Sequence, residues 1–481
     1  MGTFLYDPLR KYTVYLILVL IIFITQSCEK INRPNIILIT VDDLGWADLG
    51  CYGSKFYETP NIDRLASEGI RFTNSYAAAA VCSPTRAAIV TGKYPARTGI
   101  TDWIRAKFQG GGDENREGFE SLPGKPLSCP YNPYHLDLDE VTIAEILKEH
   151  DYMTCFIGKW HLGTEKWYPE KQGFIYNIAG CDYGQPPSYF DPYIVYPNAW
   201  LKDTLKGFPT MAPRKEGEYL TDREAAEAVA FIKANKDRPF FLNLCHYAVH
   251  TPLQAKPELI EKYKQKPPTS QKSPVYAAMV ESVDNALGLI VITLAELGLS
   301  ENTFIIFTSD NGGLLMDDAT NNAPLRSGKG YPYEGGIRIP TIFFWPGKIQ
   351  QGQISDIPIV STDYLPTICN ATGIEPSEFE DLDGISLLPH ILAGEKLERK
   401  AIFWHFPHYR GNDIVPFSII RKGDWKLIKR YDGKTFELFN LKDDLSETTE
   451  LSEKKPDKVT ELNDDLEKWL RETNARLPIR N

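Results

Sequence analysis

Four short apolar segments, each ending abruptly in polar residues, constrain the fold of this chain more than any other feature. They are NIILITV before Asp42-Asp43, TCFI before GKWH, FFLNLCHYAV before HTP, and TFIIFTS before DNGG. Stretches with helical character lie between them, at residues 141–150, 222–235 and 276–297. Apolar β-branched runs that alternate with helices are typical of buried parallel strands. We therefore expect the polar residues after each strand to meet in one crevice, at the carboxyl edge of an α/β sheet.

The pattern changes near residue 363. The segments AIFWHF, FSIIRK, DWKLIKRY and FELFNL follow one another, with a turn at Asp432-Gly433, and a helix is expected over residues 456–473. Such a succession indicates antiparallel strands. The sequence thus predicts an α/β fold with a central mixed, mostly parallel sheet flanked by helices over residues 33–362. A smaller C-terminal α+β domain with an antiparallel sheet is predicted over residues 363–481.

The N-terminus carries its own pattern. Arg10 and Lys11 precede the apolar run YTVYLILVLIIFI, and the small residues before Cys28 follow it. The run is shorter than the roughly 20 residues of a membrane span, and this order of charge, apolar core and small residues is that of an export signal. We expect residues 1–27 to be a signal peptide of the bacterial lipoprotein type, with Cys28 lipidated, although Gln26 fits that pattern poorly. Plain secretion and a retained anchor are the alternatives.

The net charge and the cysteine content argue against some classes of function. The formal net charge of -11 and the lack of a long Lys/Arg cluster argue against a nucleic-acid partner. The expected location is outside the cytoplasm: the periplasm, or the outer membrane and cell surface by a lipid anchor on Cys28. Of the 8 cysteines, those after Cys28 match no CxxC or zinc pattern and leave one odd thiol if the others pair.

Two pairs of polar residues suggest a metal site. Asp42-Asp43 and Asp310-Asn311 each follow a predicted strand and offer oxygen ligands without histidine or thiolate. Such a set suits a hard cation, and calcium is favoured over magnesium because it tolerates irregular geometry. The alternative is that these aspartates only form turns and cap helices.

Cys82 lies in the segment CSPTR, just before the helical stretch AAIVTG. Pro84 suits the first turn of a helix, which would place Cys82 at the positive end of the helix beside Arg86. An anion would be attracted there. The thiol could be a structural cysteine, half of a disulfide, or the origin of a nucleophile, and no histidine lies nearby in sequence to activate it.

The segment Cys82-Ser83-Pro84-Thr85-Arg86 resembles the signature of the type I sulfatases, which belong to the alkaline-phosphatase-like superfamily. Further similar segments occur in the same order from Pro34 to about Pro346: VDDLGWADLGCYG, TPNIDRLASEGIRFTN, TGKYPARTG, GKWHLG, HTP, SDNGG and GKGYPYEGGIRIP. The resemblance identifies residues 33–362 as the catalytic domain of a sulfuric ester hydrolase, of the kind found in bacterial polysaccharide and aryl sulfatases.

The resemblance also implies the chemistry. In that family the cysteine is oxidised to formylglycine (3-oxoalanine) by a formylglycine-generating or anaerobic sulfatase-maturating enzyme. It implies one Ca²⁺ per chain, bound by Asp42, Asp43, Asp310, Asn311 and modified Cys82. A hydroxyl of the hydrated aldehyde would attack sulfur, and His250 would donate a proton to the departing alcohol. The side chains that would contact the sulfate are Arg86, Lys159, His161, His250 and Lys329.

The substrate is predicted only by class. Aromatic residues are frequent in two long segments, residues 109–139 and 180–215, which suits stacking on sugar rings. Asp102, Trp103 and Arg105 follow the TGI segment and are candidate sugar contacts. A sulfated poly- or oligosaccharide is therefore expected. Two alternatives are a phosphodiesterase or phosphonate hydrolase of the same superfamily, and a lipoprotein that binds sulfated glycans without catalysis.

Overall fold

A computed structural model describes residue 2 and residues 33–481, apart from residues 198–200, 380, 412 and 434. The predicted signal peptide and Cys28 lie outside the described residues. The large unit is built on an 8-stranded sheet. Its strands in spatial order are β13 (Gln353–Ser355), β2 (Ile70–Phe72), β12 (Thr341–Phe344), β11 (Thr303–Ser309), β1 (Asn35–Val41), β10 (Phe240–His246), β6 (Met153–Gly158) and β7 (Tyr176–Ile178).

The sheet is mixed and mostly parallel, which confirms the predicted fold class. β12 is antiparallel to both of its neighbours, β11 and β2, and the other paired strands are parallel. The four apolar segments singled out in the sequence are the contiguous strands β11, β1, β10 and β6. One boundary was wrong: the third segment was expected to run to Val249, but β10 ends at His246. The backbone of Val249 turns away to donate a hydrogen bond to the Asp42 carbonyl.

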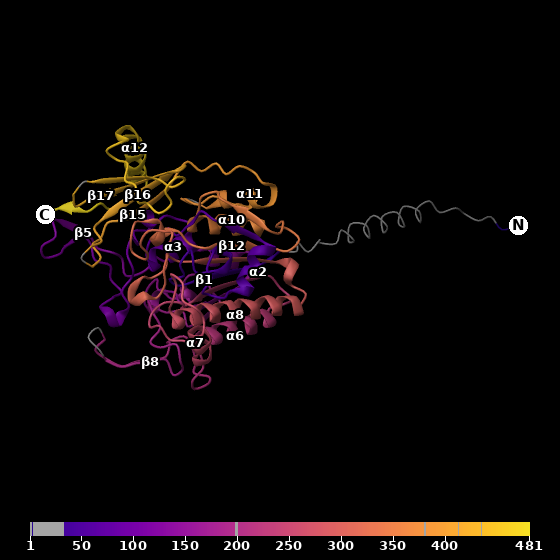
Figure 1. Ribbon diagram of the computed structural model, residues 1–481. Helices are drawn as coiled ribbons and strands as arrows, with labels where there is room; N and C mark the ends of the chain where they lie inside the picture. The colour runs from indigo at the N-terminus through magenta and orange to yellow at the C-terminus, as the bar shows by residue number, and fades with distance from the viewer. Residues whose placement is uncertain (1, 3–32, 198–200, 380, 412, 434) are drawn as a thin grey trace.

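Helices cover both faces of the large sheet (Figure 1). Along β1, Ile37, Ile39 and Val41 pack into one hydrophobic core, whereas Ile36 and Leu38 pack into the other. This alternation follows from the two-residue period of a strand. The first core is closed by α2 (Pro60–Glu68), α6 (Leu220–Ala234), α7 (Pro257–Lys264) and α8 (Pro274–Glu296), and the second by α3 (Cys82–Thr91), α5 (Ile143–Glu149), α10 (Tyr364–Ala371) and α11 (Leu388–Ala393).

Helix α8 is long and apolar enough to cross a membrane, by length and composition alone. It packs against α2, α6 and α7, however, and 72% of its apolar window is buried inside the protein. Its hydrophobicity is therefore explained by its position in the core.

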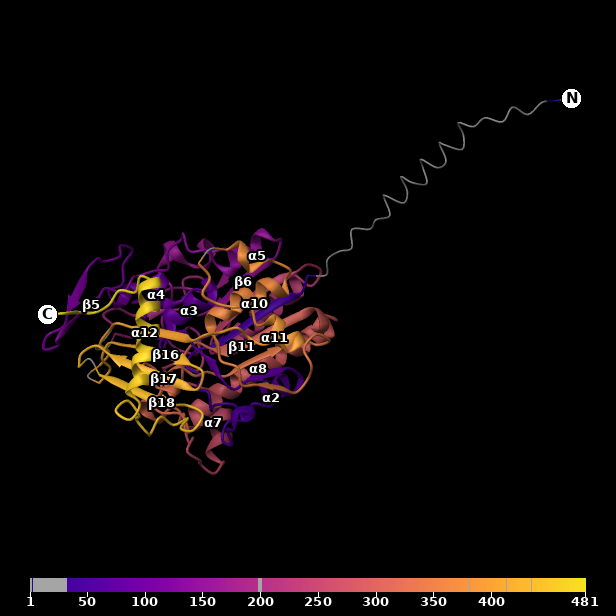
Figure 2. The same cartoon turned by 90° about the horizontal axis from the view of Figure 1, so that it is seen from above.

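The C-terminal part forms a 4-stranded antiparallel sheet, as predicted (Figure 2). Helix α12 (Pro456–Glu472) packs on it. The core of this sheet also includes residues of the large unit, among them Tyr76, Val81 and Ala88. It therefore packs directly on the segment around Cys82. Its strands are β15 (Ile402–Phe406), β16 (Phe417–Lys422), β17 (Trp425–Arg430) and β18 (Phe436–Asn440).

The predicted domain boundary at residue 363 stays a prediction. Helices α10 and α11 lie after it but pack into the core of the large sheet. The two aromatic-rich segments, residues 109–139 and 180–215, contain short strands. β4 (Phe119–Ser121) pairs with β5 (Leu127–Pro130), which also pairs with β19 (Ile479–Arg480), and β8 (Ile194–Val195) pairs with β9 (Leu205–Lys206).

Candidate active site

The polar residues predicted to meet at the carboxyl edge of the sheet do meet there. Asp42 and Asp43 follow β1, and Asp310 and Asn311 follow the adjacent β11. The backbone amide of Asp43 donates to the Asp310 carboxylate over 3.2 Å. The side-chain amide of Asn311 donates to the Asp43 carboxylate over 2.7 Å. All four side chains are fully buried. The parallel register of the strands is what places them side by side.

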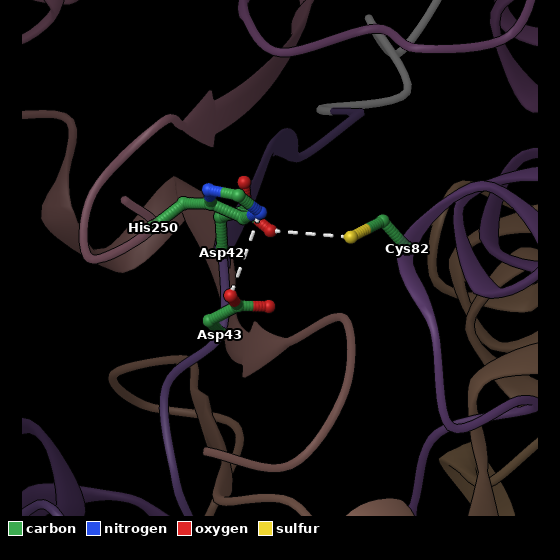
Figure 3. Close-up of side chains that lie close together, drawn as sticks. All are labelled: Asp42, Asp43, Cys82 and His250. Atoms are coloured by element: carbon green, nitrogen blue, oxygen red, sulfur yellow. Dashed lines mark hydrogen bonds and ion pairs between the residues drawn. The ribbon is translucent and has the colours of Figure 1, made fainter. Parts of the chain in front are cut away.

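Cys82 faces this cluster from the first residue of α3, as its sequence context indicated. Its Sγ lies 3.6 Å from Asp42 Oδ1 (Figure 3). Ligand atoms of Asp42, Asp43, Cys82 and His250 all lie within 4.8 Å of one another. Cys51, Cys82, Cys129, Cys155, Cys181 and Cys245 are all free thiols, so Cys82 is not half of a disulfide.

Three cations surround the three carboxylates. Lys159 Nζ lies 2.6 Å from Asp42 Oδ2, and Lys329 Nζ lies 2.6 Å from Asp43 Oδ1. The Arg86 guanidinium contacts Asp310 Oδ2 at 2.8 and 2.9 Å. Because each acid has a buried cationic partner, the cluster tolerates burial of so many charges.

Lys329 reaches the cluster from a distant loop. Its amide donates to the Gly313 carbonyl, and the Gly330 amide donates to the Ala80 carbonyl just before Cys82. Gly312 makes this packing feasible, because a Cβ there would lie 1.8 Å from the Gly335 carbonyl oxygen. The glycines of SDNGG and GKGYPYEGGIRIP therefore let two loops meet at the site.

The thiol of Cys82 is a poor nucleophile where it stands. Burial, with Asp42 and Asp310, raises its pKa to about 11 against the opposing effect of Lys159 and Lys329. A thiol with that pKa is protonated at neutral pH, and the thiolate is the reactive form. An unmodified cysteine is therefore ill suited to attack here.

Comparison with known proteins decides the family. The sulfatase family model matches residues 34–374, and a model described as the C-terminal part of N-sulphoglucosamine sulphohydrolase matches residues 328–476. The chain belongs to the sulfatase family. It is 33% identical to a sulfatase of Formosa agariphila over 94% of this chain and 91% of that protein. It is also 33% identical to human N-acetylgalactosamine-6-sulfatase, over 80% of this chain and 70% of the relative.

A solved structure agrees with this assignment. Ps i-CgsB, crystallised in complex with k-i-k-neocarrahexaose, is 32% identical, with a TM-score of 0.75 over 91% of this chain and 93% of that one. The protein is therefore a sulfuric ester hydrolase, which confirms the activity expected from the sequence.

The two histidines of the sulfatase site are held in defined tautomers. His161 Nε2 lies 2.7 Å from the Ile104 carbonyl oxygen and must donate to it, so Nδ1 is left as an acceptor, buried and without a hydrogen-bond partner. Burial, with Lys159 and Arg86, keeps its pKa well below the usual value. His250 Nδ1 donates to the Thr251 carbonyl oxygen over 2.8 Å, and its Nε2 lies 3.6 Å from Asp43 Oδ2.

The acidic cluster fits a hard cation. Two of its buried oxygens, Asp43 Oδ2 and Asn311 Oδ1, have no hydrogen-bond partner, although neighbouring atoms of the same side chains do. Carboxylate and amide oxygens are the ligands that Ca²⁺ prefers. Burial raises the pKa of Asp42 to about 8, with Asp310 adding to the rise and Lys159 opposing it. Despite burial, Lys329 and His250 hold the pKa of Asp43 below its usual value, and Arg86 and Lys159 do the same for Asp310.

A cavity of about 230 Å³ opens beside Cys82. The predicted residues Trp103, His161, His250 and Lys329 line it, whereas Arg86 and Lys159 do not and instead pair with Asp310 and Asp42. Asp102 and Arg105 line a neighbouring polar cavity that shares Trp103 as a wall. Sequence reasoning assigned no role to further lining residues. Thr251 belongs to the HTP segment, and the others lie in no motif: Gln109, Gln185, Leu314, Met316 and Arg410.

Proposed function

We propose that this sulfatase removes sulfate from a sulfated carbohydrate, by means of formylglycine formed from Cys82 and one Ca²⁺. The observation that carries the proposal is the position of Cys82, which lies at a helix N-terminus 3.6 Å from the Asp42 carboxylate and opens onto a cavity lined by cationic and histidine side chains. When present, the hydrated aldehyde would supply a nucleophilic hydroxyl, and Ca²⁺ on Asp42, Asp43, Asp310 and Asn311 would neutralise charge on sulfate oxygens.

The chain's own cations divide into two roles. Lys329 lines the cavity and is 5% exposed, so its ammonium can contact a sulfate oxygen directly and stabilise charge that develops there. Arg86 and Lys159 are 4% and 0% exposed and bind Asp310 and Asp42. We assign them to hold those two carboxylates in the orientation that the metal requires.

The histidines handle protons. His161 donates through Nε2 to Ile104, so its Nδ1 can only accept. Cys82 lines the same cavity, and we assign a hydroxyl on modified residue 82 as the donor to that nitrogen. His250 presents Nε2 to the cavity and would donate a proton to the departing alcohol. Burial and Lys329 lower the pKa of His250 to about 3 in the empty cavity. An anionic sulfate ester beside it would favour the protonated form.

Carbohydrate is the proposed substrate class for two reasons. Relatives are named N-acetylgalactosamine-6-sulfatase, and a similar structure holds k-i-k-neocarrahexaose. In this chain the Trp103 side chain lines the cavity next to Cys82, and an indole face suits a sugar ring.

One experiment tests the function as a whole. The protein is produced together with a formylglycine-generating or anaerobic sulfatase-maturating enzyme, its proposed maturation partner, and the peptide containing residue 82 is analysed by mass spectrometry. The matured protein is then incubated with sulfated mono- and oligosaccharides and with matching phosphate esters. We expect the mass of the aldehyde, release of sulfate and much less release of phosphate. Cys82→Ala should release none, and normal turnover by that variant would refute the assignment.

We also propose that the protein is exported and anchored by a lipid on Cys28, as the N-terminal sequence suggests. Labelling of cells with a radioactive fatty acid tests this. Label should appear in the wild-type protein and be absent from Cys28→Ala, and equal labelling of the two would refute it.

A further inference from the structure

We propose that Arg410 binds a second acidic group of the substrate, so that the enzyme prefers a saccharide carrying another sulfate or a carboxylate close to the scissile sulfate. The inference builds on the proposed carbohydrate substrate and adds a specificity residue to it. Arg410 lies in the loop between β15 and β16 of the C-terminal sheet, yet it lines the same cavity as Cys82, His250 and Lys329.

Local packing brings Arg410 to the cavity. The Arg410 and Ile414 backbones pair with each other, which closes the loop that carries the side chain. The side chain passes over Gly330, where a Cβ would lie 3.2 Å from Arg410 Nε. Gly330 directly follows Lys329, so the guanidinium is placed beside the loop that supplies the proposed sulfate contact.

Arg410 has no close ionic partner in the protein. Within the part of the chain that the structure describes, no carboxylate lies within 4.0 Å of it, and its Nη1 is buried without a hydrogen-bond partner. The cavity lining contains Lys329, Arg410 and two histidines but no acidic residue. Arg86, by contrast, pairs with Asp310 at 2.8 Å.

Asp102 interacts with Arg410 without forming an ion pair: burial raises the pKa of Asp102 to about 6, and the positive charge of Arg410 opposes that rise. Asp102 lines the neighbouring cavity, and its carboxylate accepts the Trp103 amide at 2.8 Å. An uncompensated, partly buried guanidinium is costly, and a carboxylate or sulfate oxygen is the partner that matches its fork of donors. The reacting sulfate is surrounded by Cys82, His250 and Lys329, so Arg410 is left for a second anion on the same sugar or on its neighbour.

Binding of matched probes tests the inference. The probes are the 4-sulfate, 6-sulfate and 4,6-disulfate of N-acetylgalactosamine, and the 2-sulfate, 6-sulfate and 2,6-disulfate of galactose. Affinities are measured by isothermal titration calorimetry with Ca²⁺, on the full chain carrying Cys82→Ala so that no probe is turned over. Arg410→Gln and Arg410→Lys are added to this background. Arg214→Gln is the control, since it removes the same charge from an exposed arginine outside the cavity.

We expect at least one disulfate to bind about tenfold or more tightly than either of its monosulfates. An advantage of that size is what one additional charge-assisted hydrogen bond to Arg410 would give. Arg410→Gln should reduce that advantage to less than about threefold, Arg410→Lys should retain part of it, and Arg214→Gln should leave it intact. The inference is overturned if no disulfate binds more tightly than its monosulfates, or if the advantage survives in Arg410→Gln. The proposed function fails by a different result, the absence of sulfate release by the matured enzyme.

Discussion

Replacement of Lys426 by methionine should destabilise the enzyme strongly, because it removes the cation between two buried glutamates. Lys426 Nζ lies 3.0 Å from Glu334 Oε1 and 2.7 Å from Glu447 Oε1, and all three side chains are 0% exposed. Glu447 also accepts the Glu334 amide at 2.7 Å. Glu334 begins α9 (Glu334–Ile337), five residues after Lys329, so these contacts join the Lys329 loop to the C-terminal sheet.

Loss of one partner from a buried ion pair costs about 3–5 kcal/mol, since the remaining charge is left without compensation. That is a large part of the roughly 5–15 kcal/mol by which proteins are stable. Methionine fills most of the space of the lysine stem, so the loss would measure charge more than packing. Lys429→Met in the same strand is the control, because Lys429 pairs with Glu467 while 19% exposed and should cost about 1 kcal/mol or less.

The loss should also depend on pH, with a defined sign. Burial raises the pKa of Glu447 to about 7, with Glu334 adding to the rise and Lys426 opposing it. Its contribution to stability therefore falls as pH rises from its ordinary value of 4.5 to about 7. Without Lys426 the pKa of Glu447 rises further, and the pKa of Glu334, which Lys426 and Arg338 hold to about 2 despite burial, rises as well. The variant should therefore lose more stability at pH 8 than at pH 5.5.

Urea unfolding followed by tryptophan fluorescence measures both effects. The wild type, Lys426→Met and Lys429→Met are compared at pH 5.5 and pH 8. A loss below about 1 kcal/mol in Lys426→Met at pH 8, or equal losses at both pH values, would refute the reasoning. Adding Glu447→Gln to Lys426→Met should restore part of the stability, because Glu447 loses its cationic partner in the single variant, whereas Glu334 keeps Arg338 at 3.3 Å.

Three further predictions concern catalysis. Lys329→Ala should lower kcat/KM about 10²-fold or more, because a cation that contacts sulfate is lost. Lys264→Ala, on the surface, is the control and should leave kcat/KM unchanged. Near-normal turnover by Lys329→Ala would contradict the proposed sulfate contact. His250→Ala should impair hydrolysis of a sugar sulfate at least tenfold more than that of 4-nitrophenyl sulfate, because the phenolate leaves without a proton; equal losses would exclude its role as proton donor. Ca²⁺ should raise the Tm of the chelated wild type but not that of Asp43→Asn, because ligand binding to the folded state is stabilising; an equal rise in both would place the metal elsewhere.

The fold was predictable because its signals are local. The four apolar segments are read from consecutive residues, and their identity as buried parallel strands follows from their composition and spacing. Their order in the sheet comes from the structure. Strand ends are less certain, as the exit of β10 after His246 shows, because the backbone pairing of Ala248 and Val249 with Asp42 that follows it has no signal in the local sequence. The short pairing of β5 with the C-terminal β19 was likewise beyond prediction, since it joins segments that are far apart in the sequence.

By itself, the sequence determined that Asp42, Asp43, Asp310 and Asn311 converge, and that Cys82 begins a helix. Both follow from rules that act within or between regular elements: parallel strands end at one edge, and proline favours the first turn of a helix. Only the tertiary structure decided which cations face the substrate. Lys329 lines the cavity, whereas Lys159 is buried and pairs with Asp42. Arg410 also lines the cavity, from a loop of the C-terminal sheet. No periodicity encodes these choices, because they depend on how irregular loops pack across distances that local sequence does not report.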